Sequence, residues 1–353
     1  MLRSRQEGAA LQPRIPAEPM GSQASMLWRQ SEEKRSDMDI KDVKKVTVAG
    51  GGMLGSQIAF QSAYRGYDVT IWLRSEGSIG RCQPKIDRLH ETYLASLEAL
   101  KTDPSAYAYG FMGKDEVSLE KIDEAKAAVE HGYKNLRLTT DWDEAFGDVD
   151  LVIEAVAEDP AQKTAFYEEL KKHLSERTVV ATNSSTLLPS QFAEATGRPD
   201  RYLALQFANE IWKNPSAEVM AQSKTDPKNF ELVCAFAASI RMVPLKVMKE
   251  QPGYLLNSML VPFLNAAEKL WATGVGSPED IDLAWKLGMG APAGPFRILD
   301  IVGLVTAYNI GRMNPAAQQE GTPENRIVSL LKEKIDAGET GVAAGKGFYD
   351  YTK

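Results

Sequence analysis

Cysteine and histidine are scarce in this chain of 353 residues, and each shortage argues against a class of site. The two cysteines, Cys82 and Cys234, lie far apart and show no CxxC spacing. A zinc site or a disulfide scaffold is therefore not expected, and a reducing, cytoplasmic compartment fits. The three histidines are His90, His131 and His173. They fall in charged segments that look helical, and we interpret them as solvated surface residues.

Long apolar runs and an excess of positive charge are also missing. No hydrophobic stretch reaches the ~18 residues that a membrane span needs. The chain has 41 Lys and Arg against 48 Asp and Glu, a formal net charge of −7, so the clustered basic surface that binds nucleic acid is not expected. We predict neither a membrane nor a nucleic acid as partner. The length and ordinary composition predict a globular protein of about two domains.

Residues 1–37 have no hydrophobic period and are rich in Arg, Gln, Glu, Ser and Pro. Their composition favours a disordered tail, or a non-native extension with Met38 as the natural start. A transit peptide is the alternative, because Arg3 and Arg5 are present. Acidic residues such as Glu7 argue against that alternative.

Regular patterning begins at Lys44 with a strand, a glycine loop and a helix. Val46 to Ala49 is apolar, residues 50–55 read Gly-x-Gly-x-x-Gly, and residues 56–64 look helical up to Gly66. In this context the glycines provide a tight turn, close approach of the backbone to a pyrophosphate, and close helix–strand packing. The helix N-terminus supplies N–H groups to the phosphates. The expected cofactor contacts here are Gly50, Gly52, Met53, Leu54 and Gly55.

Strands and helices then alternate up to Val247, and strands disappear after Gln251. The expected strands cover 69–73, 150–154, 178–182, 202–207 and 243–247, and the expected helices cover 161–174, 230–240, 254–273, 278–288 and 324–337. Residues 76–135 hold further charged helical segments. The pattern predicts an α/β fold: a Rossmann-type, mostly parallel sheet domain over 38–249, then an all-helical domain over 250–353.

The end of the second strand bears on the choice of cofactor. A carboxylate usually stands there and binds the adenine ribose hydroxyls of NAD. Here the position is Leu73, followed by Arg74. A guanidinium attracts a 2′-phosphate, so we predict NADP(H) over NAD(H). The alternative is that Arg74 is a solvated cation and NAD(H) binds without the carboxylate.

Several dispersed motifs resemble the 3-hydroxyacyl-CoA dehydrogenase family, in particular its diketoreductase and 3-hydroxybutyryl-CoA dehydrogenase branch. Besides the glycine loop they are Asn183-Ser184-Ser185-Thr186-Leu187, Leu205-Gln206-Phe207-Ala208-Asn209, Pro292-Ala293-Gly294-Pro295-Phe296 and Gly345-Lys346-Gly347-Phe348-Tyr349. The resemblance covers about residues 44–351. It implies an oxidoreductase of fatty-acid metabolism that moves hydride between a nicotinamide cofactor and a short 3-hydroxyacyl or 3-oxoacyl compound. It also implies a homodimer made through the helical domain.

The resemblance also assigns site residues. Ser185 matches the family's substrate-binding serine. Glu218, twelve residues after position 206, matches the carboxylate that orients the catalytic histidine, and Asn257 matches the asparagine of the helical domain. Positions that contact the dinucleotide in the family are Glu158, Lys163, Ser185 and Asn209 here.

The chain departs from the family at the catalytic histidine, whose position holds Gln206. An amide N–H can hydrogen-bond a developing oxyanion, but it cannot supply a proton at neutral pH. Gln206 and Ser185 are still expected to hold the oxygen. Losing a general acid typically lowers the rate by ~10²–10⁴-fold. Glu218 then either binds the Gln206 amide or, with a pKa raised by burial, donates the proton itself.

Three functions therefore stay open: a weakened reductase of short 3-oxoacyl compounds, a catalytically silent relative that binds cofactor or acyl ligand, and a dehydrogenase of another substrate whose own carboxylate or amine moves the proton. CoA attachment also stays open. Lys85, Arg88 and Lys101 are candidate phosphate ligands, but the lysine often found before the terminal glycine motif is Ala343 here.

Overall fold

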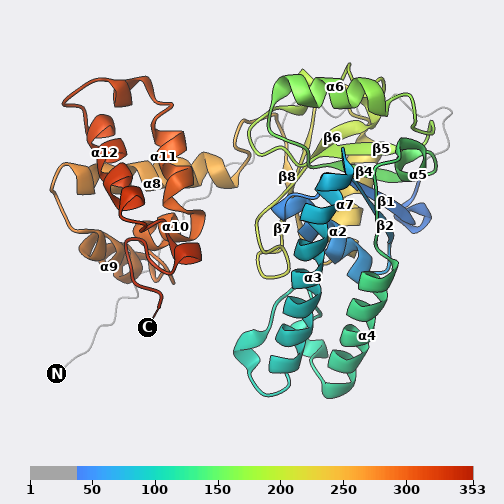
Figure 1. Cartoon of the computed structure of the whole chain (residues 1–353), viewed down its shortest axis with the longest axis horizontal. Helices are drawn as coiled ribbons and strands as arrows, with labels where there is room; N and C mark the ends of the chain where they lie inside the picture. The colour runs from blue at the N-terminus through green and yellow to red at the C-terminus, as the bar shows by residue number, and fades with distance from the viewer. Residues whose placement is uncertain (1–37, 353) are drawn as a thin grey trace, which may run out of the picture.

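The computed structural model describes residues 38–352, so the predictions made for residues 1–37 lie outside the described chain. The described part forms a sheet domain and a helical domain that stand side by side and are joined through the start of α8 (Figure 1). None of the helices in residues 38–352 is both long and apolar enough to cross a bilayer.

The first domain is built on one eight-stranded sheet in the order β3-β2-β1-β4-β5-β6-β7-β8. Its strands are β1 (Lys45–Ala49), β2 (Asp68–Trp72), β3 (Arg137–Thr139), β4 (Leu151–Glu154), β5 (Val179–Thr182), β6 (Tyr202–Phe207), β7 (Ser216–Ala221) and β8 (Val243–Val247). All neighbours are parallel except β6 and β7. The central strands are buried along their whole length, as expected of a sheet covered on both faces.

Helices cover both faces of this sheet. They are α2 (Met53–Tyr64), α3 (Glu76–Ala99), α4 (Leu119–Asn135), α5 (Trp142–Phe146), α6 (Pro160–Leu170) and α7 (Pro227–Ser239). One apolar cluster contains Ile58 of α2, Val129 of α4 and Phe236 of α7. A second contains Phe146 of α5 and Phe166 of α6. The two clusters are the cores of the two faces.

The second domain contains no strand among its described residues. Its helices are α8 (Leu256–Ala272), α9 (Pro278–Met289), α10 (Pro295–Val302), α11 (Leu304–Gly311) and α12 (Pro323–Asp336). Leu264, Phe296 and Leu331 lie at the centre of its separate core. Short 3-10 helices occur in both domains. Those of the sheet domain are Ile40–Asp42, Pro104–Ala106, Lys114–Glu116, Pro189–Gln191 and Pro199–Arg201, and those of the helical domain are Pro315–Gln318 and Val342–Ala344.

Two buried carboxylates explain the glycine motifs of the helical domain. Asp282 accepts hydrogen bonds from the Phe296 N–H (2.7 Å) and the Arg297 N–H (2.9 Å), and a Cβ on Gly294 would lie 2.4 Å from its Cγ. Asp300 accepts from the N–H groups of Phe348 (2.8 Å) and Tyr349 (3.0 Å), and a Cβ on Gly347 would lie 2.0 Å from its Oδ1. Glycine is needed where the backbone approaches a carboxylate this closely.

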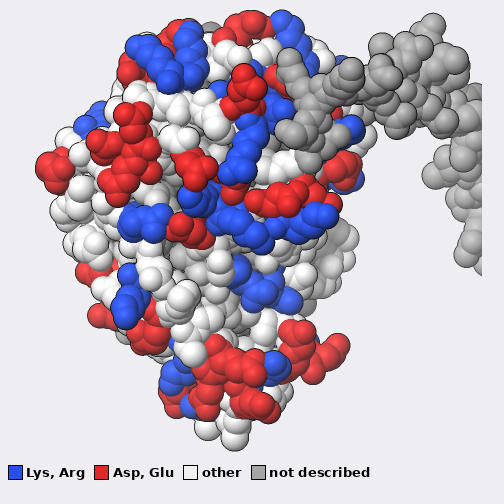
Figure 2. All heavy atoms as spheres, turned by 90° about the vertical axis from the view of Figure 1, so that its right-hand side faces the viewer, with Lys and Arg blue, Asp and Glu red and all other residues white. Residues whose placement is uncertain are grey.

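The predicted fold class is confirmed: a mostly parallel Rossmann-type sheet domain precedes a helical domain. The expected strands and helices are found with shifts of a few residues at their ends. Strands β3 and β7 and helices α5, α10 and α11 were not expected. Figure 2 shows basic and acidic side chains interspersed over most of the face of the sheet domain turned to the viewer.

Candidate functional site

The glycine loop connects β1 to α2. Gly50 has φ +120°, and a Cβ there would lie 2.4 Å from the Ala155 carbonyl oxygen that follows β4. A Cβ on Gly55 would lie 2.1 Å from the Gly50 carbonyl oxygen. Both glycines are therefore required by contacts within the protein. Met53 is 66% exposed at the start of α2, and Leu54 packs partly on the core.

Gly52 differs from its neighbours because a Cβ there would meet no protein atom within 4 Å. Gly52 is the N-cap of α2, and it offers the helix no side-chain hydrogen bond. The first N–H groups of a helix have no acceptor inside the helix. Open space in front of unsatisfied N–H groups and a positive dipole end fits a diphosphate, so the loop suits a dinucleotide.

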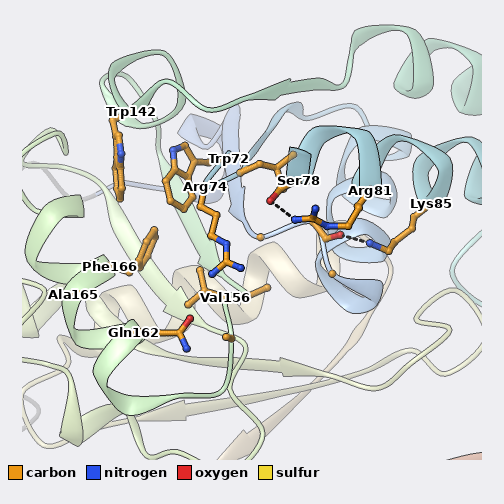
Figure 3. Close-up of a pocket in the computed structure, with 16 residues that line it drawn as sticks. Trp72, Arg74, Ser78, Arg81, Lys85, Trp142, Val156, Gln162, Ala165 and Phe166 are labelled. Atoms are coloured by element: carbon orange, nitrogen blue, oxygen red, sulfur yellow. Dashed lines mark hydrogen bonds between the residues drawn. The ribbon is translucent and has the colours of Figure 1, made fainter. Parts of the chain in front are cut away.

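A pocket of about 990 Å³ runs from this loop to α6 (Figure 3). Gly50, Gly52 and Arg74 of the predicted contacts line it, together with Ser78, Arg81 and Lys85 from α3, which were not predicted as cofactor contacts. The opposite wall is largely apolar and includes Val156 and Phe166. Lys85, expected as a CoA ligand, donates instead to the Gly51 carbonyl oxygen (2.9 Å). Lys101, another candidate phosphate ligand of CoA, forms an ion pair with Asp123 (Nζ to Oδ1, 3.0 Å).

Glu158 and Lys163 lie outside the lining of this pocket and belong to a hydrogen-bonded network behind it. The Lys163 Nζ, which is 1% exposed, lies 2.7 Å from Glu154 Oε1 and 3.4 Å from Glu158 Oε2. Burial would raise the pKa of Glu158, but hydrogen bonds from Ser184 and Thr186 and the charge of Lys163 hold it below its usual value. Lys163 is thus already neutralised by two carboxylates.

Ser185 follows β5 at the carboxyl edge of the sheet and is half-buried. Its neighbour Ser184 is buried and donates its Oγ–H to Glu158. The loop is also tied to β6, because the Phe207 N–H donates to Asn183 Oδ1 (3.1 Å). Since β5 and β6 are parallel neighbours, these contacts bring Ser185 close to the end of β6, where Gln206 lies.

Gln206 is 9% exposed and pairs directly with Glu218 across β6 and β7. Opposite residues of an antiparallel pair project from the same face. Yet the Gln206 Nε2 donates to the Phe207 carbonyl oxygen (2.9 Å), not to the carboxylate. The Gln206 amide is thus held by its own strand.

Glu218 caps the first helix of the second domain. Its Oε1 accepts hydrogen bonds from the N–H groups of Leu255 (2.8 Å) and Leu256 (3.0 Å), at the start of α8. Glu218 is 2% exposed, and a carboxylate at a helix N-terminus is stabilised by the helix dipole. The sequence did not reveal this contact, because the two partners lie in different domains.

The connection between the domains has strained backbone. Gly253 and Tyr254 have φ of +79° and +56°. The buried Tyr254 donates its OH to the Ser184 carbonyl oxygen (2.7 Å), and burial raises its pKa. Asn257 lies in the first turn of α8. The four predicted site residues Ser185, Gln206, Glu218 and Asn257 therefore lie near the connection between the two domains.

Asn209 lies in the loop after β6, is exposed, and accepts a hydrogen bond on its carbonyl from Asn214 Nδ2 (2.7 Å). The same loop is fixed to α2, since Gln57 Oε1 accepts from the Glu210 N–H (2.8 Å). Gln57 is buried, so this link is shielded from water.

The interpretation of all histidines as solvated was wrong for two of the three. His90 and His173 have side chains only 19% exposed. His90 stacks on Tyr133 (centroids 4.2 Å apart), and His173 lies 2.6 Å from Asp143. Neither lies in the site. Within residues 38–352 no group of three His, Cys, Asp or Glu is arranged to hold a metal, and both cysteines are buried and unpaired.

Comparison with known proteins gives matches along nearly the whole described chain. The NAD binding domain of 3-hydroxyacyl-CoA dehydrogenase matches residues 45–251, and its C-terminal domain matches residues 253–351. Mitochondrial hydroxyacyl-coenzyme A dehydrogenase of Homo sapiens is 32% identical over 316 residues, covering 88% of this chain and 91% of that protein. The 3-hydroxybutyryl-CoA dehydrogenase of Clostridioides difficile is 31% identical over 309 residues, covering 88% of this chain and 100% of that protein. A solved diketoreductase structure, described as acting on dicarbonyl compounds, is 41% identical with a TM-score of 0.72, covering 88% of this chain and 99% of that one.

Proposed function

The chain belongs to the 3-hydroxyacyl-CoA dehydrogenase family, and from that premise we propose that it reduces or oxidises a short 3-oxoacyl or 3-hydroxyacyl compound with a nicotinamide cofactor. The observation that carries this proposal is the open cradle at Gly52, at the same carboxyl sheet edge as Ser185 and Gln206. In doubly wound sheets ligands bind at this edge. When bound, the nicotinamide would supply or accept the hydride.

The residues of the chain would hold the cofactor and the substrate oxygen. Gly50, Gly52 and Gly55 shape the loop for the diphosphate, and the N-terminus of α2 faces it. The Ser185 hydroxyl and the Gln206 amide would donate hydrogen bonds to the reacting oxygen. The Gln206 Nε2 carries two N–H groups, so one stays on the Phe207 carbonyl oxygen while the other donates to the reacting oxygen.

No residue of this group delivers a proton as an imidazolium would. Gln206 cannot release one at neutral pH. Glu218 is occupied at Oε1 by two backbone N–H groups, so its carboxylate is committed to α8. We infer that water completes the reaction and that turnover is lower than with a histidine by ~10²–10⁴-fold.

The second candidate is a relative without turnover that binds cofactor or an acyl ligand. The observation that favours it is the glutamine at position 206 itself, because no residue of the group then delivers a proton. Ser185 and Asn257, retained at the joint, favour the enzyme.

Measuring NADPH and NADH oxidation with acetoacetyl-CoA and with simple 3-oxo acids separates the two. We would compare the natural protein, Gln206→His, and Gln319→His as a control at an exposed position. A weakened enzyme turns over slowly and gains about 10²–10⁴-fold on Gln206→His. Absent turnover that appears only in the variant supports the silent relative. Activity that falls on Gln206→His would contradict both and indicate a chemistry adapted to the amide.

We further propose NADP(H) over NAD(H), because Leu73 and Arg74 replace the ribose-binding carboxylate. We also propose a homodimer through the helical domain, where Trp285, Leu287, Met289 and Ile301 are exposed. A cytoplasmic location is supported by the two unpaired thiols. The binding of a CoA thioester, as opposed to a free acid, is tested by the two substrate types above.

A further inference from the structure

Two arginines in the glycine-loop pocket have no carboxylate partner in the described part of the chain. Arg74 and Arg81 form no ion pair there, although acidic residues outnumber basic ones. No Asp or Glu is among the residues that line the pocket. Unpaired guanidinium groups facing a pocket without carboxylates make it an anion-binding site.

The cationic groups converge from two elements. Arg74 follows β2, and Figure 3 shows its side chain extending between Trp72 and Val156. Ser78 and Arg81 lie on the first two turns of α3, where Arg81 Nη2 donates to Ser78 Oγ (2.8 Å). Residues three apart on a helix share a face, so Ser78 and Arg81 face the pocket together.

The acidic residue closest to Arg74 in the sequence is bound elsewhere. Glu76 begins α3, but its Oε1 accepts a hydrogen bond from Thr140 Oγ1 (3.1 Å), just after β3. Glu76 does not line the pocket. The N-terminus of α3, whose dipole end is positive, begins two residues after Arg74.

We propose that Arg74, Ser78 and Arg81 bind a phosphate monoester on the adenosine ribose, namely the 2′-phosphate of NADP(H). This rests on the proposed function, since it takes the diphosphate to lie along Gly50 to Gly55. The ribose hydroxyls of a dinucleotide then reach the end of β2. One guanidinium group donates two parallel hydrogen bonds to two oxygens of a phosphate, and the Ser78 hydroxyl adds a further donor. The apolar wall with Val156 and Phe166 suits the adenine.

A second molecule carries the same chemistry, because the adenosine of CoA bears a 3′-phosphate. The two sources differ in the ribose position of the phosphate, and small fragments reproduce the difference. 2′,5′-ADP has the phosphate of NADP(H), 3′,5′-ADP has that of CoA, and 5′-ADP has neither.

The test is calorimetric titration of the full chain with NADPH, NADH and these three fragments. The variants are Arg74→Gln, Arg81→Gln and Ser78→Ala, with Lys134→Gln as control, because Lys134 is an exposed cation on α4 and does not line the pocket. We expect NADPH to bind at least about tenfold tighter than NADH, and 2′,5′-ADP tighter than 3′,5′-ADP. Each arginine substitution lowers NADPH affinity by about 10- to 100-fold and leaves NADH within about threefold.

Three results overturn the assignment: NADH binding as tightly as NADPH, 3′,5′-ADP binding more tightly than 2′,5′-ADP, or equal losses for NADPH and NADH in the variants. Circular dichroism of each variant separates misfolding from lost contacts, and the Lys134→Gln control must bind like the natural protein. If neither dinucleotide binds, the proposed function itself fails. That outcome is distinct from tight but unselective binding, which refutes only the phosphate site.

Discussion

Replacing Glu218 tests whether this carboxylate anchors the start of the helical domain or acts as a catalytic base. The resemblance assigns to the matching carboxylate the role of orienting a histidine, but the position of that histidine holds Gln206 in this chain. Here Glu218 Oε1 accepts two backbone N–H groups at 2.8 and 3.0 Å in a site that is 2% exposed. A hydrogen bond to a charged acceptor contributes about 1.5–3 kcal/mol, and one to a neutral acceptor about 0.5–1.5 kcal/mol.

Glu218→Gln keeps the shape and one carbonyl oxygen but loses the charge, so each bond loses about 1 kcal/mol and the pair about 2 kcal/mol. Glu218→Ala leaves two partly buried N–H groups without a protein acceptor and is expected to lower the free energy of unfolding by about 2–4 kcal/mol. Urea titration measures both. Hydrogen exchange at the Leu255 and Leu256 amides should accelerate about thirtyfold in Glu218→Gln.

Glu250→Gln is the matched control, because Glu250 also accepts a backbone N–H, that of Ser190 (2.8 Å), but from a partly exposed position. It should change the free energy of unfolding by less than about 0.5 kcal/mol. If Glu218→Gln unfolds at the same urea concentration as the natural protein while its turnover collapses, the carboxylate acts in catalysis and the capping argument is refuted.

Two further perturbations have separable outcomes. The new Cβ in Gly52→Ala meets no protein atom within 4 Å, so the free energy of unfolding should change by less than about 0.5 kcal/mol. Dinucleotide affinity, measured by calorimetry, should fall at least about tenfold. Equal affinity would show that no diphosphate approaches this backbone. Burial raises the pKa of Glu268 to about 7 from its ordinary 4.5. The folded chain then binds more protons than the unfolded one between these values, so stability falls by about 3 kcal/mol as pH rises through that window, and a titration of Glu268→Gln should be flat there.

The sequence was enough for the sheet domain, because its signals are local. A buried strand, glycines at fixed spacing and a helix that ends at Gly66 each depend on neighbouring residues. Strand β7 was missed because it contains Ala217 and Glu218, residue types that are depleted in strands, and follows Asn214-Pro215, which reads as a loop. Glu218 was therefore placed by resemblance alone, without the strand that carries it.

The rest of the site depends on contacts between distant segments. The bonds of Glu218 to Leu255 and Leu256 join two domains, and no spacing announces them. Arg81 had a signal that was available: Ser78 and Arg81 stand three apart at the start of a helix that follows Arg74. The position of Lys85 on the glycine loop, in contrast, required the fold.

Helix α2 links the two ends of the site through Gln57. Its N-terminus faces the glycine loop, and one turn later the Gln57 side chain holds the backbone of Glu210 and Ile211, just after β6. Any shift of α2 would therefore be passed on to the segment that follows Gln206, through one buried amide and without a change in the sheet.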